Sequence, residues 1–345
     1  MLHSFIRKMP KVELHVHLEG SIQPKTLLKL ADKNNVSLPV STLDDIEKWY
    51  SFSDFDHFID IYRILGECLQ TAEDFELISS DFLKNQAHQN IQYSEVTFTP
   101  LDHRHKVSLD DQLKAINKAR FEAEKELGVT LRLIPDMSRE KTAIDDGMEL
   151  VNWAIRNRGN GIVALGLGGP EIGHPPELFE SIFRRAKKFD LASVPHAGET
   201  EGPKSIWGSI QSLNAIRIGH GVRCIEDPEL VQYLRDHQIP LEVCPTSNVK
   251  LGVFESFDKH PLPQLLEEGL CLTINSDDPP MFGTTLTKEF LNIVDTFHFD
   301  IKTIKHLVLN GIQSSLQPIE TKMGMIHHFK QSFLDLENRL NISDS

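Results

Sequence analysis

The arrangement of apolar and amphipathic segments predicts an α/β protein: a (β/α)8 TIM barrel with a helical insertion after its first strand and further helices at the C-terminal end. Eight short apolar runs recur along the 345 residues, and amphipathic stretches lie between them. Strands that alternate with helices imply a parallel sheet with helices outside it. Eight such units match a closed barrel, which usually takes about 250 residues and tolerates insertions. Since no repeat or Gly/Pro/Ser-rich linker divides the chain, we expect residues 1–345 to form one barrel domain.

Each expected element follows from its hydrophobic pattern. Apolar runs of strand length are found at residues 12–16, 91–98, 129–134, 162–167, 191–194, 215–218, 241–244 and 271–274. Apolar residues at helical spacing predict helices between these strands at residues 24–34, 109–127, 147–157, 176–189, 227–237 and 261–269. After the last strand, the same spacing predicts a helical tail at residues 288–297, 304–316 and 319–340.

The segment between the first two strands, residues 17–90, is long for a barrel connection. It carries a group of aromatic side chains, namely Trp49, Tyr50, Phe52, Phe55, Phe58 and Tyr62. Barrel active sites lie on the loops that follow the strands, so this insertion would overhang the site. Aromatic residues also dominate ordinary hydrophobic cores, and the sequence does not separate the two interpretations.

Composition narrows the class of protein. Hydrophobic residues make up 40% and charged residues 25%, as in an ordinary globular protein. The 50 acidic against 36 basic residues give a formal charge of −14, which repels phosphate backbones and makes nucleic acid a poor partner. No apolar stretch approaches the roughly 20 residues of a membrane span, and the N-terminal residues lack the apolar region of a secretory signal. Four scattered cysteines without a CxxC pair favour a reducing, cytoplasmic setting. The oligomeric state stays open, a homo-oligomer included.

The sharpest local signal is the pair His15 and His17 at the end of the first expected strand. Residues i and i+2 of a strand point to one face, so both imidazoles would project into the barrel mouth. Imidazole is a common zinc ligand, and a catalytic zinc site uses about three protein ligands plus water. Alone the pair is weak evidence, because two nearby histidines are usually surface residues.

Further polar clusters follow other apolar runs. His196 and Glu199 come after the strand at 191–194, His220 follows the strand at 215–218, and Asp277 with Asp278 follows the last strand. The aspartate pair could simply cap a helix. Gathered at strand ends with the histidines, it favours chemistry, because the carboxyl ends of barrel strands meet at one mouth.

These motifs resemble a known series. PKVELHVHLEGS, HAGE, IGHG, CPTSN and NSDDP look like the motifs of the adenosine deaminase family within the amidohydrolase superfamily. Their order and spacing match from about residue 10 to residue 290, nearly the whole chain, and together they are specific. The resemblance implies a (β/α)8 barrel that binds one Zn2+ per chain, and a small-molecule purine as its partner.

The resemblance also implies roles, position by position. The metal ligands would be His15, His17, His196 and Asp277. The proton donor to the purine N1 would be Glu199, while His220 would orient and help activate the attacking water; Asp277 counts among the catalytic residues as well. Substrate contacts would come from His17, Glu19, Gly169 and Asp278, with Asp278 at the purine N7 and the backbone of Gly169 at N3.

General chemistry agrees with these roles. Zinc lowers the pKa of bound water toward about 7 and so supplies hydroxide at neutral pH. An aromatic amidine carbon is a poor electrophile until its ring nitrogen gains a proton, which a buried carboxylic acid can deliver. We therefore expect hydrolytic deamination of a 6-aminopurine, giving the 6-oxo purine and ammonia.

Two absences sharpen the metal prediction. Two-metal relatives in the superfamily often bridge their metals with a modified lysine after the fourth strand, and the segment 161–169 contains no lysine. The other zinc deaminase architecture needs H-x-E followed by P-C-x-x-C, and here Cys244-Pro245 is reversed and lacks a second cysteine. One metal is favoured.

The substrate is less certain from the motifs. Members acting on adenosine usually have Asp after HxHL, contacting the ribose 5′-hydroxyl, where this chain has Glu19. The stretch GPEIGHPPELF is more similar to adenine deaminases and aminodeoxyfutalosine deaminases. Adenosine or an adenosine-like nucleoside is placed slightly ahead of adenine and aminodeoxyfutalosine. Another amidohydrolase activity, on an amide or ester, and a catalytically inactive purine-binding barrel remain as distant alternatives.

Overall fold

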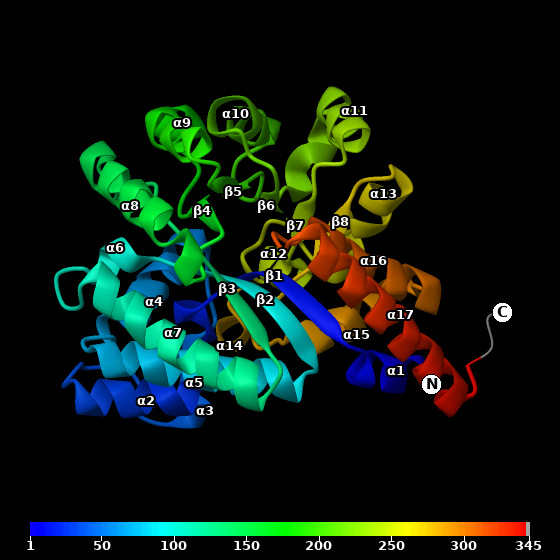
Figure 1. Ribbon diagram of the computed structural model, residues 1–345, viewed down its shortest axis with the longest axis horizontal. Helices are drawn as coiled ribbons and strands as arrows, with labels where there is room; N and C mark the ends of the chain where they lie inside the picture. The colour runs from blue at the N-terminus through cyan, green and yellow to red at the C-terminus, as the bar shows by residue number, and fades with distance from the viewer. Residues whose placement is uncertain (343–345) are drawn as a thin grey trace.

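Eight parallel strands form the centre of the protein, described by a computed structural model for residues 1–342 (Figure 1). Their bounds are β1 Lys11–His17, β2 Ile91–Phe98, β3 Thr130–Pro135, β4 Ala164–Leu167, β5 Ala192–Ala197, β6 Ile218–His220, β7 Leu241–Val243 and β8 Leu272–Ile274. Continuous pairing runs from β1 to β3 and from β4 to β8. Parallel bridges Leu133↔Ile162 and Val16↔Asp277 join these two sheets at both edges. The predicted (β/α)8 barrel is therefore confirmed.

Helices cover the outside of the strands, as the alternating pattern predicts (Figure 1). Those that follow strands β2 to β8 are α7 Leu109–Glu126, α8 Ile144–Arg156, α9 Glu180–Lys188, α10 Pro203–Leu213, α11 Pro228–His237, α13 Leu262–Glu267 and α16 Ile301–Ser314. Local sequence sets where they begin: Ser108 accepts from the backbone N–H of Asp111 at the start of α7, and Asp227 caps α11 before a proline. In α7, Leu113, Ile116 and Ala123 are buried at helical spacing.

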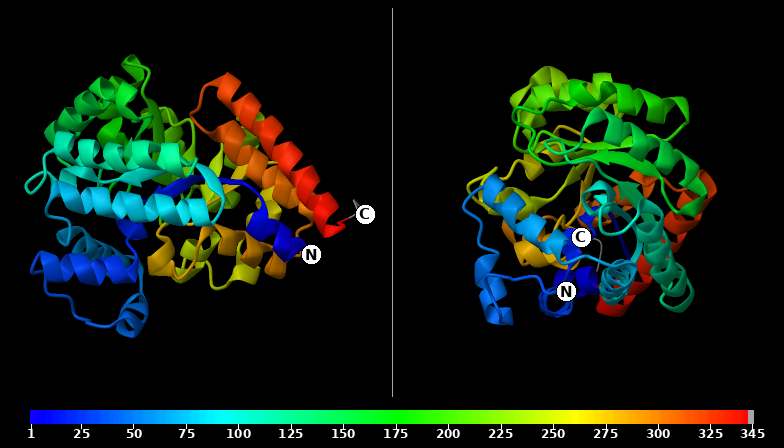
Figure 2. Two further views of the ribbon diagram at one scale, coloured as in Figure 1. Left: turned by 60° about the horizontal axis from the view of Figure 1, so that its bottom comes forward. Right: turned by 90° about the vertical axis from the view of Figure 1, so that its left-hand side faces the viewer.

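Shorter segments complete the connections. They are α6 Pro100–His103, α12 Pro245–Lys250 and α14 Pro279–Phe282, with the 3-10 turns η1 Glu19–Ser21, η2 Arg158–Asn160, η3 Pro176–Phe179, η4 Val222–Glu226 and η5 Phe257–Lys259. Three helices, α1 Leu2–Lys8, α15 Leu286–Phe297 and α17 Ile319–Leu340, pack against one another on the side of the barrel where the chain begins (Figure 2). Within residues 1–342, every helix is too short or too polar to span a bilayer.

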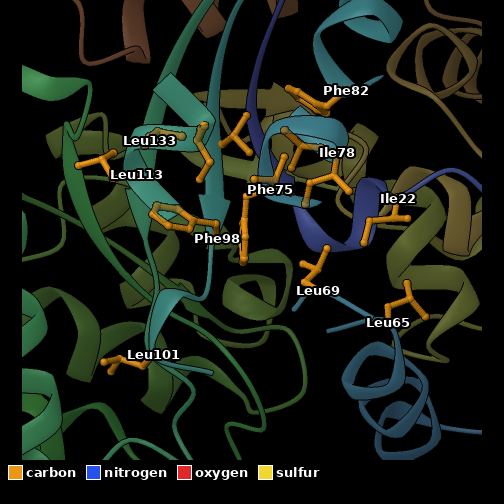
Figure 3. Packing of buried hydrophobic residues seen from close by; sticks show 14 of the residues in the cluster. Ile22, Leu65, Leu69, Phe75, Ile78, Phe82, Phe98, Leu101, Leu113 and Leu133 are labelled. Atoms are coloured by element: carbon orange, nitrogen blue, oxygen red, sulfur yellow. The ribbon is translucent and has the colours of Figure 1, made fainter. Parts of the chain in front are cut away.

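The insertion after β1 consists of α2 Pro24–Lys33, α3 Leu43–Trp49 and α4 Phe55–Glu67, and α5 Ala72–His88 then leads into β2. Figure 3 shows its packing: Leu65 and Leu69 lie near Phe75 of α5, which is next to Phe98 of β2. All four of these side chains are fully buried. The insertion is thus part of one hydrophobic core with the barrel.

The strand predictions hold for all eight strands, with shifted ends. β6 covers Ile218–His220 where residues 215–218 were expected, and β5 continues through His196 to Ala197. Polar residues at the end of each run hid these last positions, because the pattern tracks apolar residues only. Helices α1 and α10 were not predicted, and α3, α4 and α5 were expected only as unplaced parts of the helical insertion after the first strand.

Candidate active site

Four side chains that could hold a metal meet at the carboxyl ends of three strands. His15 and His17 come from β1, His196 from β5, and Asp277 from the turn after β8, and their ligand atoms all lie within 4.8 Å of one another. The Nε2 atom of His17 lies 3.1 Å from His196 Nε2 and 3.3 Å from Asp277 Oδ1. His15 Nε2 is buried, 3.5 Å from Asp277 Oδ1, and makes no hydrogen bond within the described residues. Three imidazole nitrogens converging on one carboxylate fit a divalent cation.

The ring of His15 is oriented from behind by a buried ionic network. Its Nδ1 lies 2.9 Å from Glu242 Oε2, and Arg217 bridges Glu242 and Glu95 at 2.5 and 2.6 Å. Burial favours the neutral carboxyl, but Arg217 and His15 outweigh it and hold the pKa of Glu242 below its usual value. Such a carboxylate fixes the tautomer of a metal-binding histidine and raises its basicity. This network was missed; the acid inside the apolar run 241–244 was its only signal.

Glu199 is buried on the loop after β5, and this loop is held by a second carboxylate. Glu171 accepts hydrogen bonds from four consecutive backbone N–H groups, those of residues 198–201, at 2.8–3.3 Å. The Oε1 atom of Glu199 has no partner in the described part of the chain. Burial, together with the negative charges of Asp277 and Glu171, raises the pKa of Glu199 well above its usual value. Glu199 is therefore suited to act as a general acid.

His220 stands at the end of β6 beside the four potential ligands. Its Nε2 lies 3.6 Å from Glu199 Oε2 and 3.9 Å from Asp277 Oδ2. Burial lowers the pKa of His220 to about 3, so the ring is neutral. His220, Cys244 and Asp277 form a second group whose atoms are close enough to share a metal.

Asp278 is buried next to Asp277 and faces the same cavity. Burial and the adjacent Asp277 raise the pKa of Asp278 well above the usual value, which favours its protonated form. The glycine of the HLEGS motif has a steric purpose here: a Cβ on Gly20 would lie 1.6 Å from Asp278 Oδ1. Any side chain at position 20 would displace Asp278.

The cavity in front of these residues encloses about 630 Å3, part of it open to solvent. Helix α4 forms one wall with Phe55, Phe58, Ile59 and Tyr62. The aromatic residues of the insertion therefore both line the site and pack in the hydrophobic core. Phe58 and Tyr50 are buried in the core, while Phe58 also lines the cavity.

Gly169 lies in the wall as expected, but Glu19 does not. Gly169 has a φ of +84° and lines the cavity with its backbone. Glu19 is fully buried behind the wall, where its carboxylate accepts from the backbone N–H of Thr99 at 2.9 Å and lies 3.3 Å from His103 Nε2. Glu19 was expected among the substrate contacts, but these donors turn its carboxylate away from the cavity. It reaches the cavity only through the hydroxyl of Tyr62, 3.5 Å away.

The structure adds a carboxylate that the motifs did not indicate. Asp136 follows β3, is buried and lines the cavity, and its Oδ1 lacks a hydrogen-bond partner among residues 1–342. Two glycines of β4 and its loop leave room for it: a Cβ on Gly166 or Gly168 would lie 2.5 Å from a carboxylate oxygen of Asp136. Burial raises the pKa of Asp136 to about 7. The only sequence signal is the run GLGG, which reads as a turn.

A parallel barrel whose strand ends gather three imidazoles and a carboxylate, next to a buried carboxyl group with a raised pKa, is typical of a metal-dependent hydrolase. The comparison with known families makes this specific. The family model described as adenosine deaminase matches residues 10–332. The chain belongs to the adenosine deaminase family, and it is a hydrolytic deaminase.

Individual relatives narrow the group further. An aminodeoxyfutalosine deaminase from Streptomyces avermitilis is 39% identical over 318 residues, covering 91% of this chain and 88% of the relative. The crystal structure of an adenine deaminase from Arthrobacter aurescens has a TM-score of 0.89 at 32% identity, covering 94% and 98% of the two chains. An amidohydrolase from Burkholderia ambifaria with bound zinc has a TM-score of 0.91 at 25% identity, covering 99% and 95%.

Proposed function

We propose that the protein hydrolyses the 6-amino group of an adenine-type compound that carries a substituent on N9, with aminodeoxyfutalosine as the first candidate. The observation that carries the deaminase chemistry is the buried Glu199, with its raised pKa, beside the converging ligand set. The reaction replaces the amino group with oxygen and releases ammonia, leaving a 6-oxo purine.

The residues divide the work by chemistry. A divalent metal held by His15, His17, His196 and Asp277 would lower the pKa of water toward about 7 and so supply the nucleophile. Glu199 delivers its proton to N1, which makes C6 electrophilic. In its protonated form, which burial and the adjacent Asp277 favour by raising its pKa, Asp278 would donate a hydrogen bond to the acceptor N7.

The cavity supports a substrate larger than a bare purine. It extends from the glycine wall at Gly168 and Gly169 to Phe55, Arg63 and Leu251. Gly169 would contact N3, so the substituent on the adjacent N9 would run along α4.

The comparisons change the order of the candidate substrates. The motifs placed adenosine or a similar nucleoside first, whereas the two functions named among the similar proteins above are aminodeoxyfutalosine deaminase and adenine deaminase. Adenosine itself has no support from them. Adenine is the second candidate.

We further propose one zinc ion per chain, supported by the single converging set of three histidines and one aspartate and by the zinc-bound Burkholderia structure. Metal analysis of protein purified without chelator should give about one equivalent. Two equivalents, or full activity of metal-free protein, would contradict the single-metal site. We also propose a cytoplasmic setting, supported by the four free cysteines.

The function is tested by an ultraviolet assay with aminodeoxyfutalosine, adenine, adenosine and deoxyadenosine at equal concentrations. We expect the highest kcat/KM with aminodeoxyfutalosine. A higher value with adenine would make the protein an adenine deaminase, and no turnover of any of the four by metal-loaded protein would overturn the proposal.

A further inference from the structure

A chain of hydrogen bonds behind His220 begins at a donor whose direction is fixed. The backbone N–H of Leu262, at the start of α13, donates to Nδ1 of His260 at 3.1 Å. A backbone N–H can only donate, so His260 Nδ1 must carry a lone pair and no proton. His260 is buried, and burial lowers its pKa to about 3, which keeps the ring neutral. The single ring proton of His260 is therefore on Nε2.

The same logic passes through Asn248 of the CPTSN motif. His260 Nε2 lies 3.1 Å from Asn248 Oδ1, and its proton can only be donated to that oxygen. The amide orientation is thereby determined, and the Nδ2 group of Asn248 lies 3.3 Å from Nδ1 of His220. An amide NH2 donates, so His220 Nδ1 accepts. A neutral His220 then carries its proton on Nε2.

We propose that Asn248 and His260 are positioning residues that hold His220 as the Nε2–H tautomer, so that His220 donates a hydrogen bond to the attacking water and does not remove its proton. The proton that this water loses goes to the carboxylate that Glu199 becomes once it has protonated N1. The reference to the attacking water rests on the proposed function; the tautomer itself does not. His220 Nε2 points toward carboxyl oxygens of Glu199 and Asp277, at 3.6 and 3.9 Å, which is a favourable surrounding for an N–H group.

The assigned tautomer also resolves the competition between the two potential metal groups. In the group of His220, Cys244 and Asp277, a metal would need a lone pair on a ring nitrogen of His220. The lone pair of Nδ1 is engaged by Asn248, and Nε2 carries the proton. His220 is thus excluded as a ligand, and the set of His15, His17, His196 and Asp277 remains.

The tautomer can be measured directly in the intact protein. In protein labelled with 15N-histidine, long-range proton–nitrogen correlation spectra distinguish protonated from unprotonated ring nitrogens. The His220 signals are assigned as those missing from His220→Ala. We expect a protonated Nε2 and an unprotonated Nδ1. A proton on Nδ1, or on both nitrogens, at neutral pH would overturn the proposal.

The isosteric variant Asn248→Asp tests the role of the hydrogen bonds that link His260, Asn248 and His220. A carboxylate accepts at both ends, so it can still bind His260 but reverses the bond to His220, which should switch to the Nδ1–H tautomer. A wrong tautomer at a catalytic histidine costs up to about 10⁴ in rate, so we expect kcat to fall about 10²- to 10⁴-fold, with KM and metal content little changed. His260→Phe, which frees the amide to turn over, should have a smaller effect on kcat.

The matched control is Ser247→Ala, the neighbouring buried position in α12, whose hydroxyl forms no hydrogen bond within residues 1–342. It should leave both the spectrum and kcat within a few-fold of wild type. If Asn248→Asp keeps the wild-type tautomer and turnover, the hydrogen bonds from His260 and Asn248 do not control the tautomer of His220. Should Asn248→Asp fail to fold, the wild-type spectrum still decides the tautomer. If no 6-aminopurine is turned over but Nε2 is protonated, the proposed function fails and the tautomer assignment stands.

Discussion

The floor and the mouth of the cavity are built in different ways. On the floor, His15, His196 and Asp277 are less than 9% exposed and are carried by strand ends that the barrel fixes in place. At the mouth, Arg63 and Lys141 are paired with Glu140 and Asp102 while their side chains remain about 40% exposed. Exposed ion pairs contribute little and rearrange easily. The difference teaches that the groups proposed for the reaction stand on strand ends and the turns that follow them, whereas exposed ion pairs from α4, α6 and the loop after β3 form the mouth.

Glu199→Gln tests the floor and should have the largest effect. The amide keeps the shape but cannot deliver a proton, so kcat/KM should fall about 10²- to 10⁴-fold with metal content unchanged. Because burial raises the pKa of Glu199 and the protonated form is the one that acts, wild-type kcat/KM should decline as pH rises through that pKa. The variant should lack this decline. Turnover within a few-fold of wild type would remove Glu199 from the mechanism.

Glu171→Gln tests how much turnover depends on the carboxylate that holds the Glu199 loop, with the proposed acid itself unchanged. The substitution replaces one of two accepting oxygens with an amide that cannot accept, next to four N–H donors. Each lost bond to a charged group costs about 1.5–3 kcal/mol, so we expect lower thermal stability and about a tenfold or greater loss in kcat. Glu180→Gln, at an exposed position in α9, is the control and should change neither quantity. Unchanged kcat in Glu171→Gln would mean that the loop is held by its other contacts.

Asp136 lies between the floor and the mouth of the cavity, and Asp136→Asn should change the preference between substrates. Its unpartnered oxygen can accept a hydrogen bond from a hydroxyl on the N9 substituent. Measured above pH 7, where the Asp136 carboxyl is mostly ionised, loss of the charge should lower kcat/KM for a nucleoside-type substrate about 10- to 100-fold, with less effect on adenine. Asp102→Asn, at the rim, should leave the ratio of the two values within a few-fold. A uniform loss for both substrates would assign Asp136 to the floor.

Glu19→Asp should have the smallest effect on catalysis. The shorter side chain withdraws the carboxylate from the N–H of Thr99 and from His103, at a cost of about 1–3 kcal/mol in unfolding free energy. Because Glu19 does not line the cavity, the substrate ratio should stay unchanged. Thermal denaturation and kcat/KM on two substrates measure both effects. A large shift in the ratio would show that Tyr62 transmits the position of Glu19 to the cavity.

The sequence was informative where a residue type carries its own chemistry. His15 and His17 were placed by strand alternation alone, and the fold followed from eight apolar runs. The sequence did not reveal the supporting residues Glu242 and Asp136. Each looks like an isolated acid until the barrel brings Arg217 beside Glu242 and the β4 glycines beside Asp136.

Glu19 shows the limit of arguing from position along the chain. It stands two residues after a potential ligand, but that says nothing of the direction of its side chain. The neighbouring backbone N–H of Thr99 and the ring of His103 decide that direction, and both come from the far side of the long insertion.

The bridge between Val16 and Asp277 has a consequence for folding during synthesis of the chain. The residue that closes the ring of strands is also the carboxylate of the ligand set, while the first two histidines stand near the start of the chain. These histidines leave the ribosome early, whereas Asp277 is synthesised only after most of the chain. Contacts so distant in sequence form late, because closing the long loop costs entropy before it is rewarded. Metal acquisition and completion of the barrel are therefore expected to coincide, and a truncated chain that ends before the last strand would be unable to do either.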